Sequence, residues 1–149
     1  MGLDMYLKGK RYLHEYSSVD VPTKRIVNDA FAGTPVHGKI NEVSAEIMYW
    51  RKANAIHNWF VTNCQGGRDE CQLTYVSRED LAKLRDLCRE VLTSKCAEKL
   101  PPTSGFFFGS TDVDEGYYAD LQYTADTITE IVDNSAAYKE WDFFYQASW

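Results

Sequence analysis

The residues best suited to chemistry lie together in segment 49–60, which reads YWRKANAIHNWF. A helix that only packs on a core needs an apolar stripe with charges opposite it, so this mixture of aromatic, cationic, amide and imidazole groups indicates a surface that faces a ligand. At about 100° per residue, a helix over 50–64 gathers several of these side chains near one flank. They supply a stacking ring, anion-binding cations, an amide and a titratable imidazole. The candidate residues are Trp50, Arg51, Lys52, Asn54 and His57.

The same segment also fits a purely structural role. In that reading Trp50 and Trp59 are core aromatics, and His57 is a buried histidine whose hydrogen bonds are satisfied. Arg51 then pairs with an acidic side chain. Both readings stay open at the level of the sequence.

Three consecutive phenylalanines between two glycines form the second unusual feature. Phe106, Phe107 and Phe108 cannot all point the same way in an extended segment, so at least one is expected to face outward. An outward ring could form the opposite wall of a slot in which a ligand stacks. The alternative is a buried strand or loop that fills the core.

Acidic residues precede the last predicted helix. Asp112, Asp114 and Glu115, with Asp120 shortly after them, could hold a hard cation or act in acid–base catalysis. Of these, Asp112 and Asp114 are the candidates to act with His57. Acids before a helix also stabilise its positive end, which is the simpler explanation. The sequence has no GxxxxGK[ST] loop, no GxSxG nucleophile and no CxxC pair. The leading interpretation therefore needs no metal, no cofactor and no catalytic residue.

Composition limits the classes of partner. The 149 residues fit one domain, 1–149, and the net charge of -6 with a pI near 5.0 disfavours generic nucleic-acid binding. The chain starts without a basic stretch and an apolar run, and no segment approaches the roughly 18 apolar residues of a membrane span. We therefore expect a cytoplasmic protein with no membrane partner.

Hydrophobic periodicity predicts an α+β fold, a mainly antiparallel sheet of about four strands with three helices packed on one face. Segment 14–40 is rich in Pro, Gly and Ser, which predicts a loop-rich excursion with a short strand or helical turn near 25–27. The expected strands are 3–8, 43–47, 72–76 and 141–149, and the expected helices are 50–64, 77–98 and 116–133.

Three motifs carry a resemblance. GLDMYL at 2–7, YWRKANAIHNWF at 49–60 and LPPTSGFFFGS at 100–110 resemble a family of small uncharacterised proteins of bacteriophages and bacterial genomes. The resemblance covers most of the chain, but the family brings no established activity and assigns no site residue. A phage protein would act in the host cytoplasm. Sequestering a nucleotide signal of host immunity is one role that suits stacking and anion-binding groups.

Three functions are compatible with these features. The favoured one is a binding protein for a small phosphorylated or nucleotide-derived ligand, which stacks between Trp50 and one of the phenylalanines 106–108 while Arg51 and Lys52 meet phosphate. Asn54 and His57 then give specificity. The second is a phosphoesterase or transferase that uses His57 with Asp112 or Asp114. The third is an interaction or inhibitor module whose aromatic surface docks on another protein or on its own copy.

Overall fold

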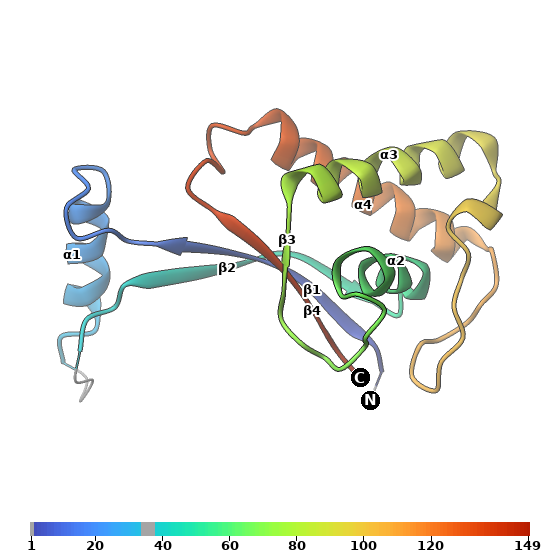
Figure 1. Ribbon diagram of the computed structural model, residues 1–149, viewed down its shortest axis with the longest axis horizontal. Coiled ribbons are helices and arrows are strands. Elements are labelled where there is room, and N and C mark those ends of the chain that lie inside the picture. Colours follow the sequence, from blue (N-terminus) through green and yellow to red (C-terminus); the bar gives the residue numbers. More distant parts are fainter. Residues whose placement is uncertain (1, 34–37) are drawn as a thin grey trace.

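A four-stranded antiparallel sheet forms the centre of the computed structural model, which describes residues 2–33 and 38–149 (Figure 1). The strands are β1 (Asp4–Tyr12), β2 (Glu42–Arg51), β3 (Thr74–Val76) and β4 (Asp142–Ser148). Their order in the sheet is β2-β1-β4-β3, so the last strand along the chain lies inside the sheet, between β1 and β3. Met5 and Leu7 of β1 are fully buried, whereas Tyr6 between them is half-buried on the other face, as alternation requires.

Three helices lie on one face of this sheet (Figure 1). They are α2 (Asn54–Cys64), α3 (Arg78–Ser94) and α4 (Glu115–Asp133), and a short 3-10 helix, η1 (Ala97–Lys99), follows α3. Ser77 caps α3 by accepting the N–H of Asp80 at 3.0 Å, and Asp114 caps α4 by accepting the N–H of Tyr117 at 3.0 Å. These two caps satisfy backbone donors that the first helical turn leaves free.

The core lies between the sheet and these helices. Its largest fully buried side chains include Tyr145, Phe60 and Phe143, with Phe60 stacked on Tyr145 at 4.0 Å between ring centroids. No helix among the described residues is long and apolar enough to cross a membrane. The predicted α+β class and the four-stranded antiparallel sheet are confirmed, but the predicted number of three helices is wrong.

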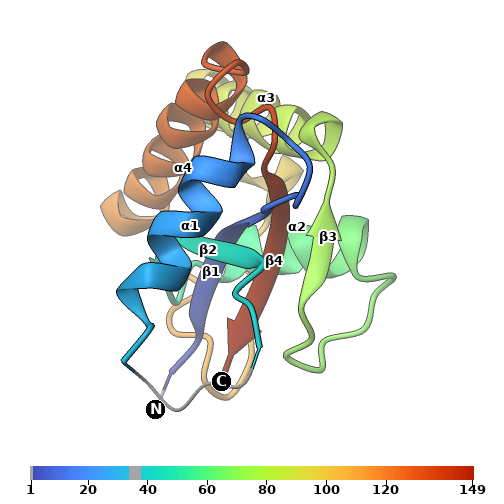
Figure 2. The same ribbon diagram turned by 90° about the vertical axis from the view of Figure 1, so that its left-hand side faces the viewer.

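The fourth helix, α1 (Asp20–Ala30), occupies the middle of the predicted excursion 14–40. It stands at the far end of the β1–β2 ribbon, away from the other helices, and is nearest the viewer in Figure 2. Pro22 falls in its first turn, where a missing N–H costs little. The sequence does not predict this helix because its apolar residues do not recur at the spacing of a stripe that faces the core. A single helical turn was the most that the sequence suggested near 25–27.

The helix expected over 50–64 begins four residues later than predicted. Trp50 and Arg51 belong to β2, where buried Met48 and Trp50 alternate with exposed Tyr49 and Arg51. Lys52 then adopts a left-handed backbone conformation with φ of 59°, which ends the strand. Helix α2 starts at Asn54, so the two halves of the motif 49–60 belong to different elements.

Candidate functional site

His57 is a buried and fully hydrogen-bonded side chain on α2. Its Nδ1 lies 2.7 Å from the Tyr145 hydroxyl, and its Nε2 lies 2.9 Å from Asp69 Oδ2. Burial, and next the charge of Asp69, raise the pKa of Tyr145 well above 10, so the phenol keeps its proton and its O–H is available to donate a hydrogen bond to Nδ1. Nε2 then carries the imidazole proton and donates to Asp69, which also accepts from Trp149 Nε1 at 3.1 Å. The network holds the loop after α2 against β4.

Asn54 fixes the phenylalanine loop. This buried side chain donates from Nδ2 to the carbonyl oxygens of Phe108 at 3.0 Å and Ser110 at 2.8 Å. Its Oδ1 accepts the N–H of Thr103 at 2.9 Å. The amide thus uses three of its hydrogen-bonding positions on the backbone of one loop, and its role here is to position that loop.

Trp50, Arg51 and Lys52 point to different surroundings. Trp50 is 2% exposed, and its Nε1 donates to Thr124 Oγ1 at 2.8 Å. Arg51 is exposed on the strand. A Cβ at Gly109 would lie 3.1 Å from the Lys52 stem, so that stem runs close along the loop backbone. The structure therefore does not gather these three side chains around one ligand position.

The three phenylalanines differ sharply in environment. Phe106 is 95% exposed and meets the ring of Phe107 edge-on at 4.7 Å. Phe108 packs against the core and meets the His57 ring edge-on at 5.0 Å. Trp50 has its ring contacts with Phe60 and Tyr123. Of the predicted set, the structure brings Asn54, His57 and Phe108 together, while Trp50 and the phenylalanine loop do not face each other across a slot.

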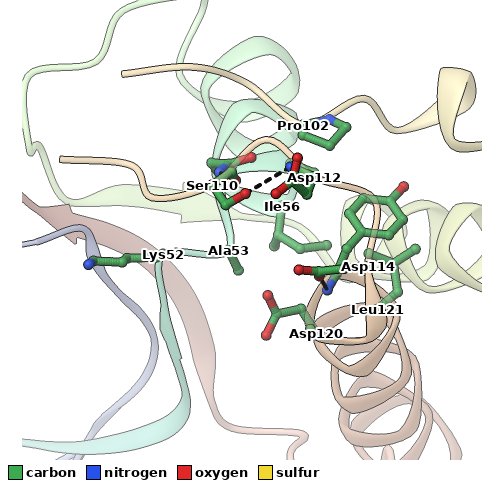
Figure 3. A pocket seen from close by; sticks show the side chains of 13 residues that line it. Lys52, Ala53, Ile56, Pro102, Ser110, Asp112, Asp114, Asp120 and Leu121 are labelled. Atoms are coloured by element: carbon green, nitrogen blue, oxygen red, sulfur yellow. Dashed lines mark hydrogen bonds between the residues drawn. The ribbon is translucent and has the colours of Figure 1, made fainter. Parts of the chain in front are cut away.

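A solvent-open pocket of about 160 Å³ lies between the N-terminal ends of α2 and α4 (Figure 3). The segment that precedes α4 closes it on a third side. We call it the α2–α4 pocket. Lysine, small and apolar residues line one part of it and three aspartates line another. Its lining residues are Lys52, Ala53, Asn54, Ala55, Ile56, Pro102, Ser110, Asp112, Asp114, Gly116, Tyr117, Asp120 and Leu121.

Asp120 is the chemically distinctive group of the pocket. Burial, and next the charge of Asp114, raise its pKa from 3.8 to about 6. Its carboxylate makes no hydrogen bond or ion pair within residues 2–33 and 38–149. Figure 3 shows the Asp114 and Asp120 side chains beside each other on the pocket wall. A carboxyl group with this pKa takes up and releases protons near neutral pH.

The opposite wall carries hydrogen-bond donors. Helix α2 has no side-chain cap, and the backbone N–H groups of Ala55 and Ile56 have no acceptor in the part of the chain that the structure describes. Both residues line the pocket. Open N–H groups at the start of a helix favour an anionic group. The pocket therefore offers donors on one side and carboxylates on the other.

Asp112 and Asp114, the acids predicted as alternative catalytic residues, both line the pocket, whereas His57 does not. Asp120, which the sequence placed with these acids without a role of its own, lines the same pocket, and its burial distinguishes it from them. The described residues include no group of three or more His, Cys, Asp or Glu side chains that could hold a metal ion.

Two of the cysteines are poor nucleophiles. All four are free thiols, and burial raises the pKa of Cys64 to about 11 and of Cys88 to about 12. A thiol with such a pKa is protonated at neutral pH and reacts slowly.

Comparison with protein-family models, curated proteins and solved structures gave no match.

Proposed function

We propose that this protein binds a small ligand in the α2–α4 pocket. The observation that carries the proposal is Asp120, a partly buried carboxylate that lines a solvent-open pocket without a partner among the described residues. Burying an ionisable group without a partner costs free energy. A ligand that donates hydrogen bonds or carries positive charge recovers that cost on binding.

The charges of the pocket define the ligand class. Asp112, Asp114 and Asp120 favour an ammonium or hydroxyl group, and the open N–H groups of Ala55 and Ile56 favour a carboxylate or phosphate. A ligand with both groups, such as an amino acid or a small phosphorylated amine, satisfies the two walls together. Three carboxylates repel a ligand that is only anionic.

The volume of the pocket also favours a small ligand. Its volume of about 160 Å³ is below the range of roughly 300–1,000 Å³ that encloses drug-sized ligands. A nucleotide would therefore project out of it. A nucleotide-derived ligand that stacks on Trp50, and a role in sequestering a host immune signal, stay predictions from the sequence.

An NMR titration tests the proposal. Amino acids, phosphorylated amines, simple amines, inorganic phosphate and nucleotides are added in turn to ¹⁵N-labelled protein. We expect a zwitterionic compound to shift the amide signals of Ala55 and Gly116, which line opposite walls. Asp120→Asn should weaken this binding by about tenfold, the scale of one lost charge-assisted hydrogen bond. Glu130→Gln, on an exposed position of the same helix, is the matched control.

Failure of every compound to shift the pocket amides at millimolar concentration would overturn the proposal. Shifts confined to residues near Trp50 and the phenylalanine loop on adding nucleotides would instead support the site predicted from the sequence.

A second candidate function is acid–base catalysis in the same pocket, favoured by the pKa of Asp120 near 6. In this version Asp120 accepts or donates the proton, and burial together with the charge of Asp114 keeps the pKa of Asp120 high. Turnover of a compound that binds the pocket, with a pH–rate profile that changes near pH 6 and disappears in Asp120→Asn, would support it. Binding without turnover would leave the ligand-binding function alone.

A further inference from the structure

Helix α1 stands apart from the rest of the molecule. It lies at the end of the β1–β2 ribbon, opposite the end of the sheet where α2 begins (Figures 1 and 2). None of its residues belongs to the core cluster, and Asp20 is its only buried residue. Polar side chains attach it to the ribbon. Asp20 pairs with Arg11, and Asn28 exchanges two hydrogen bonds with the backbone of Ile40, at 2.8 and 3.1 Å.

Helix α1 carries apolar residues on its exposed side as well as on its covered side. Its covered positions are Asp20, Val21, Lys24, Val27 and Asn28, which are buried or half-buried. The side that faces solvent carries apolar residues at helical spacing, with Val19 68% and Ile26 69% exposed. Pro22 and Ala30 lie on the same exposed stripe. The helix therefore leaves an apolar stripe exposed to solvent, although it has few apolar residues to bury against the ribbon.

A helix of this length needs an apolar contact to be stable. Helices shorter than about 12–15 residues are marginal in water, and most helices in proteins gain their stability by packing an apolar face. The eleven residues of α1 leave that face uncovered. The exposed apolar stripe of Val19, Pro22, Ile26 and Ala30 thus indicates that another surface covers it.

The charges beside the stripe indicate what covers it. At about 100° per residue, Arg25 and Asp29 fall on the same flank of the helix, next to Ile26. Both are exposed, and neither makes an ion pair with any residue in 2–33 or 38–149. When two identical helices pack antiparallel around a two-fold axis, the same flank of each helix meets. Arg25 of one helix then lies near Asp29 of the other helix, and Asp29 of the first helix lies near Arg25 of the second.

We propose that α1 is the contact surface of a homodimer. Two copies pack their exposed stripes antiparallel, with Ile26 near the two-fold axis and Arg25 of each copy beside Asp29 of the partner subunit. A parallel pair would set this flank against the opposite flank, which holds the uncharged Thr23, and would give no such reciprocal pairing. The antiparallel homodimer covers the apolar stripe and pairs both charges at once.

The dimer is expected to be weak and concentration-dependent. One short helix from each copy buries less than the roughly 1,200 Å² typical of a stable interface. Association should therefore be visible at high protein concentration and reversible on dilution. It does not involve the α2–α4 pocket, so it stands independently of the proposed function.

Sedimentation velocity of the full chain, from low micromolar to near-millimolar concentration, tests the proposal. We expect a monomer–dimer equilibrium in the wild type. Ile26→Asp should weaken it by at least about tenfold, as truncation of a central apolar contact does. Phe106→Asp is the control, because Phe106 is a more exposed apolar residue on a different surface. Far-UV circular dichroism verifies that each variant is folded.

Charge exchange tests the antiparallel arrangement separately. Asp29→Arg and Arg25→Asp should each weaken the dimer, because like charges then meet across the two-fold axis. The double variant R25D/D29R should restore it, since the reciprocal pairs return with their signs exchanged. A wild type that stays monomeric at every concentration, or a dimer indifferent to Ile26→Asp, would overturn the proposal.

Discussion

The buried or partly buried polar residues at and near α2 fall into two groups, which differ in whether their side chains have partners. Asn54 and His57 use their hydrogen-bonding atoms on Thr103, Tyr145, Asp69 and the phenylalanine loop. Asp120, on the pocket wall formed by α4, has no such partner in the described parts of the chain.

This difference distinguishes side chains that stabilise the fold from a side chain that is available to bind a ligand. A satisfied polar group stabilises one arrangement of the chain and has little left to offer a ligand. An unsatisfied carboxylate in a pocket costs stability in the free protein and gains a partner on binding. Mutation of a side chain whose hydrogen bonds are satisfied should therefore change mainly stability, whereas mutation of the unpartnered carboxylate should change mainly ligand binding.

The largest effect on stability is expected from Trp50→Ala. Trp50 is 2% exposed and donates a hydrogen bond to Thr124, so its loss should lower the free energy of unfolding by about 3–5 kcal/mol. Urea unfolding followed by circular dichroism measures this. Arg51→Ala, at the exposed neighbouring position of the same strand, is the control and should cost less than about 0.5 kcal/mol. Equal costs for the two variants would contradict a core role for Trp50.

Asn54→Ala should have the next largest effect. It leaves the carbonyl oxygens of Phe108 and Ser110 and the N–H of Thr103 without their partner, which should cost about 2–3 kcal/mol. Hydrogen exchange of the amides in 103–110 should accelerate, because the loop loses its attachment to α2. Unchanged exchange in this loop would show that Asn54 does not hold it.

Asp120→Asn should act in the opposite direction. Folding raises the pKa of Asp120 from 3.8 to about 6, so the folded state binds the proton more tightly than the unfolded state. The stabilising contribution of the protonated group is present below about pH 4 and is lost as the pH rises through about 6. Removal of the charge should therefore raise the free energy of unfolding at pH 7 by about 1 kcal/mol, allowing for partial solvent screening.

The same variant should show no gain at low pH, where Asp120 is protonated in both states. Urea unfolding at about pH 7 and about pH 3 gives the two values. A gain that does not depend on pH would mean that the carboxylate charge is not the cause.

Phe106→Ser should have the smallest effect. The side chain is 95% exposed, so the free energy of unfolding should change by less than about 0.5 kcal/mol. Binding in the α2–α4 pocket should also be unchanged, because Phe106 does not line it. Loss of binding would restore the phenylalanine loop as a ligand wall, which the sequence predicted.

The sequence predicts the sheet well because burial on one face imposes alternation. Met5 and Leu7 alternate with Tyr6, and Phe143 and Tyr145 alternate with Phe144, as expected for half-buried strands. The same rule could have corrected the start of α2, since Met48 and Trp50 continue the alternation of β2. The helix over 50–64 was predicted instead because it would gather the chemically varied side chains of segment 49–60 on one flank.

Helix α1 and the pocket were harder to predict for physical reasons. The apolar residues of α1 do not face the core, so periodicity gives no inward stripe to recognise. Asp120 stands among ordinary helix residues, and its pKa depends on burial and on the nearby Asp114. The acids Asp112 and Asp114 were recognisable candidates, but only the folded chain shows that they share a pocket with the start of α2.

The place of β4 in the sheet has a consequence for synthesis of the chain. Strands β1 and β2 can pair as soon as both have left the ribosome, but β3 has no neighbour until residues 142–148 emerge. The apolar undersides of α2, α3 and α4 meet an incomplete sheet until then. Because β4 joins segments that are far apart in sequence, the core closes late and slowly. During that interval the half-built protein exposes apolar surface that chaperones recognise.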